Sequence, residues 1–283
     1  MASNEIDLIK SITGAVDSAI KQSFDGYNSR AYIVNDGEFV AKFPKHDAVN
    51  YKGEAKTLGH LESIKTEINL QKVKWASDDF SRIILHGVKG TPLSEMKNLS
   101  LAEKTDIAGQ LGKFLKQLHT VKIDMGGENL EQELSNYNDA YKEVGEFYKS
   151  NLTKEELARL NFLMFDYFPN HRRRLGENLV FCHADIFENN IFIDENGKVG
   201  IIDFGNTGYF DQAADFMLEG ELRQLTLDSY GADETLRKKV ELKFDMSLLL
   251  YSKWEIARNG KDAAIKKCIP ILRAVIEKPR DDE

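Results

Sequence analysis

Three side chains with oxygen donors fall within one short stretch of the sequence, at Asp185, Asn190 and Asp203. The first two stand in a loop that enters a predicted hairpin, and Asp203 stands at the end of the second strand of that hairpin. Asn196-Gly197 is a strong two-residue turn signal between them. Because a hairpin brings its two ends together, we expect the three side chains to converge. Two carboxylates and an amide at one point suit a hard divalent cation and a hydroxyl that must lose its proton.

A lysine far upstream has a context that suits phosphate binding. Residues 31–34 and 38–43 alternate in polarity around a turn and predict a hairpin, with Lys42 on its second strand. Glu54 opens a predicted helix that runs to Leu61. A strand lysine held by a helix glutamate can bind phosphate oxygens as a fixed point charge.

Hydrophobic periodicity and capping signals predict several helices. Apolar residues near helical spacing favour a helix over residues 4–21. Ser100 with Glu103, and Thr153 with Glu156, form capping boxes that each predict the start of a helix.

The sequence changes character near its first third. Residues 71–75 and 82–85 have the pattern of strands, whereas predicted helices dominate further on. Residues 86–93 combine two glycines with a proline and form the best candidate boundary. We therefore expect two lobes, residues 1–88 and residues 89–283.

Charge is distributed unevenly along the chain, whose net charge is −8. Residues 1–90 hold 12 Lys+Arg and 12 Asp+Glu, whereas residues 91–283 hold 26 and 34. An acidic C-terminal part disfavours a nucleic-acid partner, which needs a basic face. It is compatible with attraction of a cationic small molecule, but charge alone favours a surface that only keeps the protein in solution.

Nothing in the sequence indicates a membrane partner or secretion. No run is long and apolar enough to span a bilayer, and the N-terminal residues lack the basic and apolar regions of a signal peptide. Cys182 and Cys268 form no CxxC and sit in apolar runs, as reduced core cysteines do. We therefore expect a cytoplasmic protein.

Several common catalytic motifs are absent. The sequence has no GxxxxGK(S/T), no GxGxxG after a strand, no HExxH and no GxSxG. What it contains, in order, is a turn loop with one glycine, a strand lysine, a helix glutamate, a hinge-like break, and two aspartate motifs. These last are H-A-D-I-F-E-N-N at residues 183–190 and I-I-D-F-G at residues 201–205.

This ordered set resembles the protein-kinase-like fold and, more specifically, the aminoglycoside phosphotransferase family. The two aspartate motifs resemble that family's H-G-D-x4-N and I-D-F/W-G, and D-Q-A-A-D at residues 211–215 resembles its D-P-A-A-D. Residues 39–46 and 90–94 resemble segments of the branch that modifies the 2″ hydroxyl of aminoglycosides. The sequence departs from the pattern at Ala184, where the family has glycine, and at Gln212, where it has proline. A loop that keeps φ negative would accept Ala184.

The resemblance implies an α+β fold with two lobes. Residues 1–88 would form a nucleotide-binding lobe, a five-stranded antiparallel sheet with a helix. Residues 89–283 would form a mostly helical catalytic and substrate-binding lobe that contains the catalytic hairpin. The chain would act as a monomer.

The resemblance also assigns roles to the residues of the site. Asn190 and Asp203 would coordinate Mg²⁺, Asp185 would accept the proton of the acceptor hydroxyl, and Lys42, oriented by Glu54, would hold the α- and β-phosphates of ATP or GTP. Other nucleotide contacts would come from Ser29 with the backbone of loop 24–30, and from the hinge residues Ile84, His86 and Val88. His183 would support the catalytic loop, and Asp215 would hold its backbone.

The acceptor is expected to be a small molecule rather than a protein. Phe187 stands where protein kinases usually carry a lysine, and the segment between Gly205 and Asp215 is too short for an activation segment. A cationic acceptor such as an aminoglycoside suits the acidic C-terminal part. The candidate contacts are Glu219, Glu221, Asp228, Trp254 and Glu255.

Two other functions fit the same residues. One is a kinase of the same fold that acts on choline, a macrolide or a sugar. The other is a nucleotide-binding pseudo-enzyme with a regulatory role. The intact set of Lys42, Asp185, Asn190 and Asp203 disfavours the pseudo-enzyme, because a protein that only binds nucleotide is free to lose one of them.

Overall fold

The computed structural model describes residues 2–23 and 28–280 and divides into two compact units. The first comprises Met1–Gly126, Phe181–Gly208 and Asp215–Gly231, and the second comprises Gly127–Val180, Tyr209–Ala214 and Ala232–Glu283. The predicted catalytic and metal-binding residues all belong to the first unit. The division into a nucleotide-binding lobe and a catalytic lobe at residue 88 remains a prediction. The two units are defined by compactness, which does not show where a nucleotide binds.

The first unit contains a five-stranded sheet in the order β1-β2-β3-β6-β5, with every pair antiparallel. Its strands are β1 (Ile20–Gln22), β2 (Ser29–Val34), β3 (Phe39–Pro44), β5 (Lys72–Ala76) and β6 (Ile83–His86). The predicted hairpin is present as β2 and β3, in which Ala31 lies opposite Lys42. This sheet confirms the predicted architecture of the N-terminal part.

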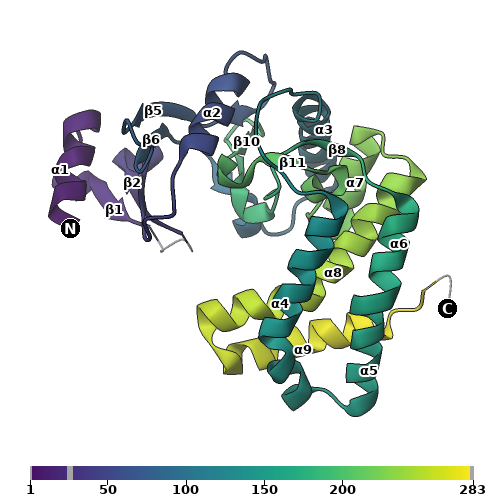
Figure 1. The fold of residues 1–283 in the computed structure, drawn as a ribbon. Helices are drawn as coiled ribbons and strands as arrows, with labels where there is room; N and C mark the ends of the chain where they lie inside the picture. Colours follow the sequence, from purple (N-terminus) through teal and green to yellow (C-terminus); the bar gives the residue numbers. More distant parts are fainter. Residues whose placement is uncertain (1, 24–27, 281–283) are drawn as a thin grey trace. The chain divides into compact units, whose positions relative to one another are not determined.

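Two helices cover opposite faces of this sheet (Figure 1). Helix α1 (Ala2–Thr13) packs on the face that carries Phe39. Because side chains alternate along a strand, Lys42 points to the other face, where α2 (Lys52–Leu61) presents Glu54. The alternation of β3 therefore places the lysine on the side of the predicted site.

The N-terminal helix is shorter than the predicted range of residues 4–21. It ends at Thr13, where Gly14 adopts a φ of +72° and donates its N–H to the carbonyl of Lys10 at 2.9 Å. A glycine with positive φ is a common end of a helix. Val16, one of the apolar residues that suggested the longer helix, is 64% exposed. The prediction was wrong beyond Thr13, because the spacing of apolar residues does not show that the backbone leaves the helical conformation at Gly14.

The predicted catalytic hairpin is present as β9 (Ile191–Ile193) and β10 (Val199–Ile201). Gly197 has a φ of +77° in its turn, a conformation that favours glycine. Two strands from earlier in the chain extend the hairpin into a four-stranded sheet in the order β4-β10-β9-β7. Strand β4 (Asn69–Leu70) is parallel to β10, and β7 (Thr91–Pro92) is antiparallel to β9.

Two helices complete the first unit, α3 (Leu101–Leu118) and α7 (Gly220–Tyr230). The predicted capping box opens α3, with Ser100 Oγ accepting the N–H of Glu103 and the Glu103 carboxylate accepting the N–H of Ser100. Gly112 allows α7 to approach closely, because a Cβ at that position would lie 2.7 Å from the Cβ of Ser229. Short 3-10 turns link the elements: η1 (Asp17–Ala19), η2 (Asn35–Gly37), η3 (Leu93–Glu95), η5 (Glu188–Asn190), η6 (Phe204–Asn206) and η7 (Gln212–Asp215).

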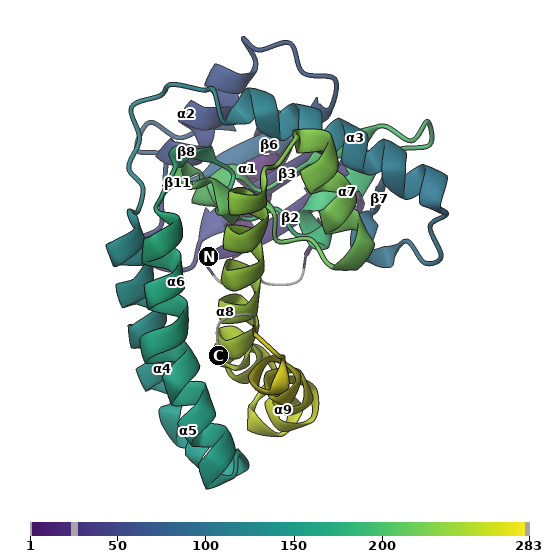
Figure 2. The same ribbon diagram turned by 90° about the vertical axis from the view of Figure 1, so that its right-hand side faces the viewer.

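Helices make up most of the second unit (Figure 2). They are α4 (Leu130–Asn151), α5 (Lys154–Phe162), α6 (Phe168–Leu175), α8 (Glu234–Asn259) and α9 (Lys261–Glu277). The second predicted capping box, Thr153 with Glu156, opens α5, and the π-helical segment η4 (Leu163–Tyr167) joins α5 to α6. Strands β8 (Leu179–Cys182) and β11 (Gly208–Asp211) form a two-stranded sheet. No helix in the described residues has both the length and the apolar character needed to cross a bilayer.

A buried group of charges joins four segments of the second unit. The fully buried Arg172 of α6 lies 3.2 Å from Glu133 of α4 and 3.6 Å from Asp211, and Lys239 of α8 lies 3.1 Å from Asp211. Lys243 of α8 also pairs with Glu133. Burial pushes the pKa of both carboxyls upward, but the neighbouring cations outweigh it and hold each pKa below its usual value.

Acid is therefore expected to destabilise the second unit through Glu133 and Asp211. A carboxyl with a lowered pKa in the folded state contributes stability above its unfolded pKa and loses that contribution as pH falls through the folded pKa. We expect Glu133→Gln to lower the free energy of unfolding at pH 7 by roughly 3 kcal/mol, because Lys243 and Arg172 lose a buried counter-ion. The variant should lose less further stability than the parent between pH 5 and pH 3. Urea unfolding across this range measures both, and parallel pH curves would contradict the assignment.

Candidate active site

The predicted phosphate-binding lysine lies between two carboxylates. Lys42 Nζ is 2.7 Å from Glu54 Oε1 and 2.9 Å from Asp203 Oδ1. Burial opposes the positive charge of Lys42, but the two carboxylates outweigh it and raise the pKa of Lys42 above its usual value. The side chain of Glu54 is almost completely buried, whereas that of Asp203 is half exposed. The lysine is thus charged and fixed in position, and Asp203 keeps an oxygen available for another partner.

The predicted proton acceptor, Asp185, is held by two amides. Asn190 Nδ2 donates to the Asp185 carbonyl at 2.9 Å and to its Oδ2 at 3.1 Å, and Asn206 Nδ2 donates to the same Oδ2 at 3.4 Å. Burial and the charge of Asp203 raise the pKa of Asp185 to about 6, and the two amides oppose that rise. Both amides engage one carboxylate oxygen, which leaves Oδ1 for an incoming hydroxyl.

Asp215 binds the backbone of the loop that carries Asp185, as predicted. Its fully buried carboxylate accepts the N–H of His183 at 3.0 Å and the N–H of Ala184 at 2.7 Å. The ring of His119 lies 3.1 Å from the same carboxylate. His183 is buried as well, and its Nε2 lies 3.0 Å from the carbonyl of Ile202 at the end of the hairpin. Burial lowers the pKa of His183, so the ring is neutral and supports the loop.

Ala184 does not meet the condition of a negative φ under which the loop would accept alanine without strain. Its φ is +61°, in the left-handed region where the resembled motif has glycine. That conformation costs a residue with a Cβ about 1–2 kcal/mol. The bonds that the N–H groups of His183 and Ala184 donate to the Asp215 carboxylate hold the loop in this shape despite the cost. The motif survives the substitution because tertiary contacts impose the backbone conformation.

Ala184→Gly is expected to raise the free energy of unfolding by about 0.5–1 kcal/mol. The relief of strain exceeds the extra entropy that glycine brings to the unfolded chain. Ala158→Gly is the matched control, because Ala158 is an exposed residue in the middle of α5. It should lower stability by up to about 1 kcal/mol. Urea unfolding of the two variants measures the difference, and equal losses of stability would exclude strain at Ala184.

The predicted nucleotide contacts lie on two sides of β3. Ser29 begins β2, and its Oγ accepts a hydrogen bond from Tyr51 at 2.8 Å. Residues 24–27 of the predicted phosphate loop lie outside the described residues. Ile84 and His86 belong to β6, which lies between β3 and β5, with Ile84 fully buried, and Val88 follows the strand. The predicted hinge residues thus lie in β6 and just after its end.

The five predicted acceptor contacts do not all lie in one unit. Glu219, Glu221 and Asp228 are exposed on or next to α7 in the first unit, and Glu221 pairs with Lys104 at 2.9 Å. Trp254 and Glu255 belong to α8 in the second unit. Trp254 is 55% exposed, whereas Glu255 is buried and accepts hydrogen bonds from Asn259 and Lys267.

Two residues of the site were missed by sequence reasoning. Asn206, which contacts Asp185, directly follows the D-F-G motif, and that position could have identified it. His119, which contacts Asp215, lies 96 residues away along the chain and carries no spacing signal. Its partner could be found only from the folded structure.

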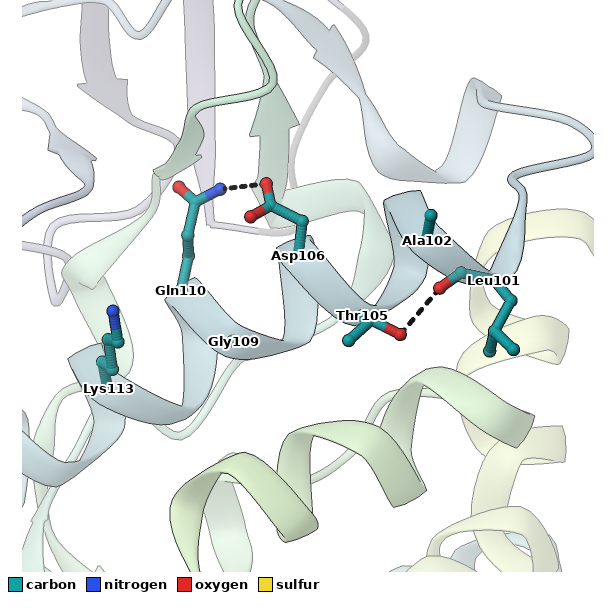
Figure 3. A pocket seen from close by; sticks show the side chains of 7 residues that line it. All are labelled: Leu101, Ala102, Thr105, Asp106, Gly109, Gln110 and Lys113. Atoms are coloured by element: carbon teal, nitrogen blue, oxygen red, sulfur yellow. Dashed lines mark hydrogen bonds between the residues drawn. The ribbon is translucent and has the colours of Figure 1, made fainter.

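The hollow on α3 is separate from these residues. It measures roughly 740 Å³ and is lined by one face of the helix: Leu101, Ala102, Thr105, Asp106, Gly109, Gln110 and Lys113. In Figure 3, Gln110 and Asp106 lie side by side on this helix, joined by a hydrogen bond of 2.9 Å. None of the predicted site residues lines this hollow.

Comparisons with known proteins agree with this geometry. Residues 20–219 match the phosphotransferase enzyme family. The gentamicin complex of APH(2″)-IIa shares the fold at 20% identity, with 99% of this chain and 97% of that chain covered and a TM-score of 0.73. The GDP and kanamycin complex of APH(2″)-IIIa gives 19% identity, 96% and 98% coverage, and a TM-score of 0.79. The macrolide 2′-phosphotransferase MphH from Brachybacterium faecium gives 15% identity, 99% and 100% coverage, and a TM-score of 0.66.

The structure agrees with these matches. It contains the five-stranded sheet and the catalytic hairpin, and its site residues follow one another in the order of the resembled family. The family match spans the strand lysine, the catalytic loop, the D-F-G motif and Asp215. From this match over most of its length, we conclude that the chain belongs to the phosphotransferase enzyme family.

Proposed function

We propose that this protein transfers the γ-phosphoryl group of ATP or GTP to a hydroxyl of an aminoglycoside, in a reaction that requires Mg²⁺. The observation that carries the proposal is the pair of adjacent clusters in the first unit. One is Lys42 with Glu54 and Asp203, and the other is Asp185 with Asn190. Together they supply a fixed cation, oxygen ligands for a metal and a carboxylate for the acceptor.

The donors of Asn190 and Asp203 fit a magnesium ion. The Nδ2 of Asn190 is engaged by Asp185, so its amide oxygen is the atom available to a metal. Asp203 contacts Lys42 through Oδ1, and its half-exposed side chain leaves the carboxylate accessible to a metal. Amide and carboxylate oxygens are ligands that Mg²⁺ accepts. When bound, the ion would neutralise charge on the phosphates.

In the proposed reaction, Asp185 orients the acceptor hydroxyl through Oδ1 and takes its proton. Its pKa of about 6 leaves it ionised at neutral pH. A stronger base is not required, because positioning and charge stabilisation supply most of the rate in phosphoryl transfer. Lys42 binds phosphate oxygens, and Glu54 holds it in place by a short ion pair in a buried setting.

The acceptor class rests on the relatives and on charge. Two relatives of the same fold bind gentamicin and kanamycin, which are the named ligands of their structures. Glu219, Glu221 and Asp228 offer exposed carboxylates to a cationic sugar. Trp254 and Glu255 are further proposed contacts. A macrolide 2′-phosphotransferase of the same fold supports a second candidate function, a kinase of another small alcohol such as a macrolide or choline.

A panel of acceptors tests the proposal. The protein is incubated with Mg-ATP or Mg-GTP and with aminoglycosides, macrolides, choline or sugars, and Asp185→Asn serves as the control. Transfer to an aminoglycoside that disappears in the control supports the proposal. Transfer only to another acceptor supports the second candidate, and nucleotide binding without any transfer would contradict both. Such a reaction would give resistance to the antibiotic, and bacterial growth on aminoglycoside plates tests this proposed role. We also propose that the protein acts as a cytoplasmic monomer.

A further inference from the structure

Gln71 is a buried residue that contacts Asp203 from a distant part of the chain. It lies between β4 and β5 and is 2% exposed. Its Oε1 accepts the backbone N–H of Asp203 at 2.9 Å. The contact follows from the parallel pairing of β4 with β10, which sets Leu70 opposite Ile201. Gln71 directly follows β4, and Asp203 lies two residues after the end of β10, so this pairing brings the two residues together.

The backbone of Asp203 adopts an uncommon conformation. Its φ of 67° and ψ of 64° lie in the left-handed region, which non-glycine residues enter at a cost. This conformation turns the chain out of β10 and directs the carboxylate of Asp203 to Lys42. The preceding N–H, of Ile202, bonds the carbonyl of Asn190 at 3.0 Å. Two successive N–H groups are therefore fixed at this turn. Asn190, the other proposed metal ligand, accepts the N–H of Ile202, and Gln71 accepts the N–H of Asp203.

A second glutamine makes the same kind of bond elsewhere on β10. Gln110 of α3 accepts the N–H of Val199 at 2.9 Å, and its Nε2 donates to the carbonyl of Gly197 at 2.9 Å. Gln110 therefore supports the first residue of the strand, whereas Gln71 supports the turn that follows the last. If Gln71 only stabilised the fold, removing Gln71 and removing Gln110 should affect catalysis to the same extent.

We propose that Gln71 is a positioning residue that holds Asp203 in the conformation required for metal binding. This inference rests on the proposed function, in which Asp203 is a magnesium ligand. Groups that orient a metal ligand typically change metal affinity or activity by about 10–100-fold when they are removed. Gln71 acts on the backbone of the ligand, so its removal should weaken metal binding while the donor atoms stay present.

The test compares Gln71→Leu with Gln110→Leu in the full chain. Leucine at position 71 keeps a similar volume, and the apolar residues Leu61 and Ile68 are among those that line the same hollow as Gln71. We expect Gln71→Leu to raise the half-saturating Mg²⁺ concentration for transfer by about 10-fold and to lower kcat. Gln110→Leu should leave the magnesium dependence unchanged. Gln71→Met, a second variant without an acceptor oxygen, should behave as Gln71→Leu does.

Calorimetric titration gives a readout that does not depend on activity. ADP binding is measured with excess Mg²⁺ and again with EDTA. For Gln71→Leu, affinity with Mg²⁺ should fall while affinity with EDTA stays at the parent value. If both Gln71 variants are folded and keep the parent's magnesium dependence, the positioning role is wrong. If Asp203→Asn also keeps the parent's magnesium dependence, Asp203 is not a magnesium ligand, and the inference fails together with that part of the proposed function.

Discussion

Asp185→Asn is expected to reduce kcat for phosphoryl transfer by about 10³-fold, within the range for loss of a general base. The substitution keeps the shape of the side chain, and the new amide oxygen can still accept from Asn190 and Asn206. What is lost is the negative charge and the site for the hydroxyl proton. Affinity for nucleotide should change little, because Asp185 contacts the acceptor rather than the phosphates in the proposed reaction.

Steady-state kinetics with the best acceptor and calorimetric titration of nucleotide measure these two quantities. Asp194→Asn is the matched control, because Asp194 lies in the turn of the hairpin that follows the Asp185 loop and its carboxylate accepts the N–H groups of Asn196 and Lys198. That control should lose stability but retain kcat. A kcat for Asp185→Asn within 10-fold of the parent would show that another group accepts the proton.

Lys42→Met is expected to lower both the rate of phosphoryl transfer and the free energy of unfolding. Without the lysine, Glu54 is left as a buried carboxylate with no cation beside it, which typically costs about 3–5 kcal/mol. Loss of the charge that binds phosphate should lower kcat/KM by at least about 10²-fold. Urea unfolding and kinetics measure the two effects separately.

The double variant Lys42→Met with Glu54→Gln separates the two causes. A neutral amide at position 54 removes the buried charge, so most of the lost stability should return. Activity should not return, because the phosphate-binding cation is still absent. If Lys42→Met alone were as stable as the parent, the burial of Glu54 would have no energetic consequence. If the double variant regained activity, Lys42 could not be the phosphate ligand.

Several features followed from the sequence because short-range physics decides them. The Asn196-Gly197 signal predicted the turn of the catalytic hairpin, and the structure places that turn between β9 and β10. The capping boxes at Ser100 and Thr153 were confirmed as the starts of α3 and α5. Alternation along β3 also placed Lys42 on the face opposite Phe39. In each case the determining contacts lie within a few residues of one another.

Tertiary structure alone decided which distant groups meet. Lys42 and Asp203 are 161 residues apart, and no local pattern specifies their contact distance. Only the family resemblance linked them before the fold was known. The bond between Gln71 and Asp203 spans 132 residues and depends on the register of β4 against β10. The positive φ of Ala184 is likewise held by the bond of its N–H to Asp215, although a residue with a Cβ favours a negative φ.

The sequence by itself therefore determined the chemical groups of the site, their order and the local turns and helices that carry them. The tertiary structure decided how these groups are oriented, because orientation depends on hydrogen bonds between segments far apart in the chain. Local propensities favour a conformation by about 1 kcal/mol per residue, which a few buried hydrogen bonds can override. Ala184 and Asp203 are both held in left-handed conformations in this way, by Asp215 and Gln71 respectively.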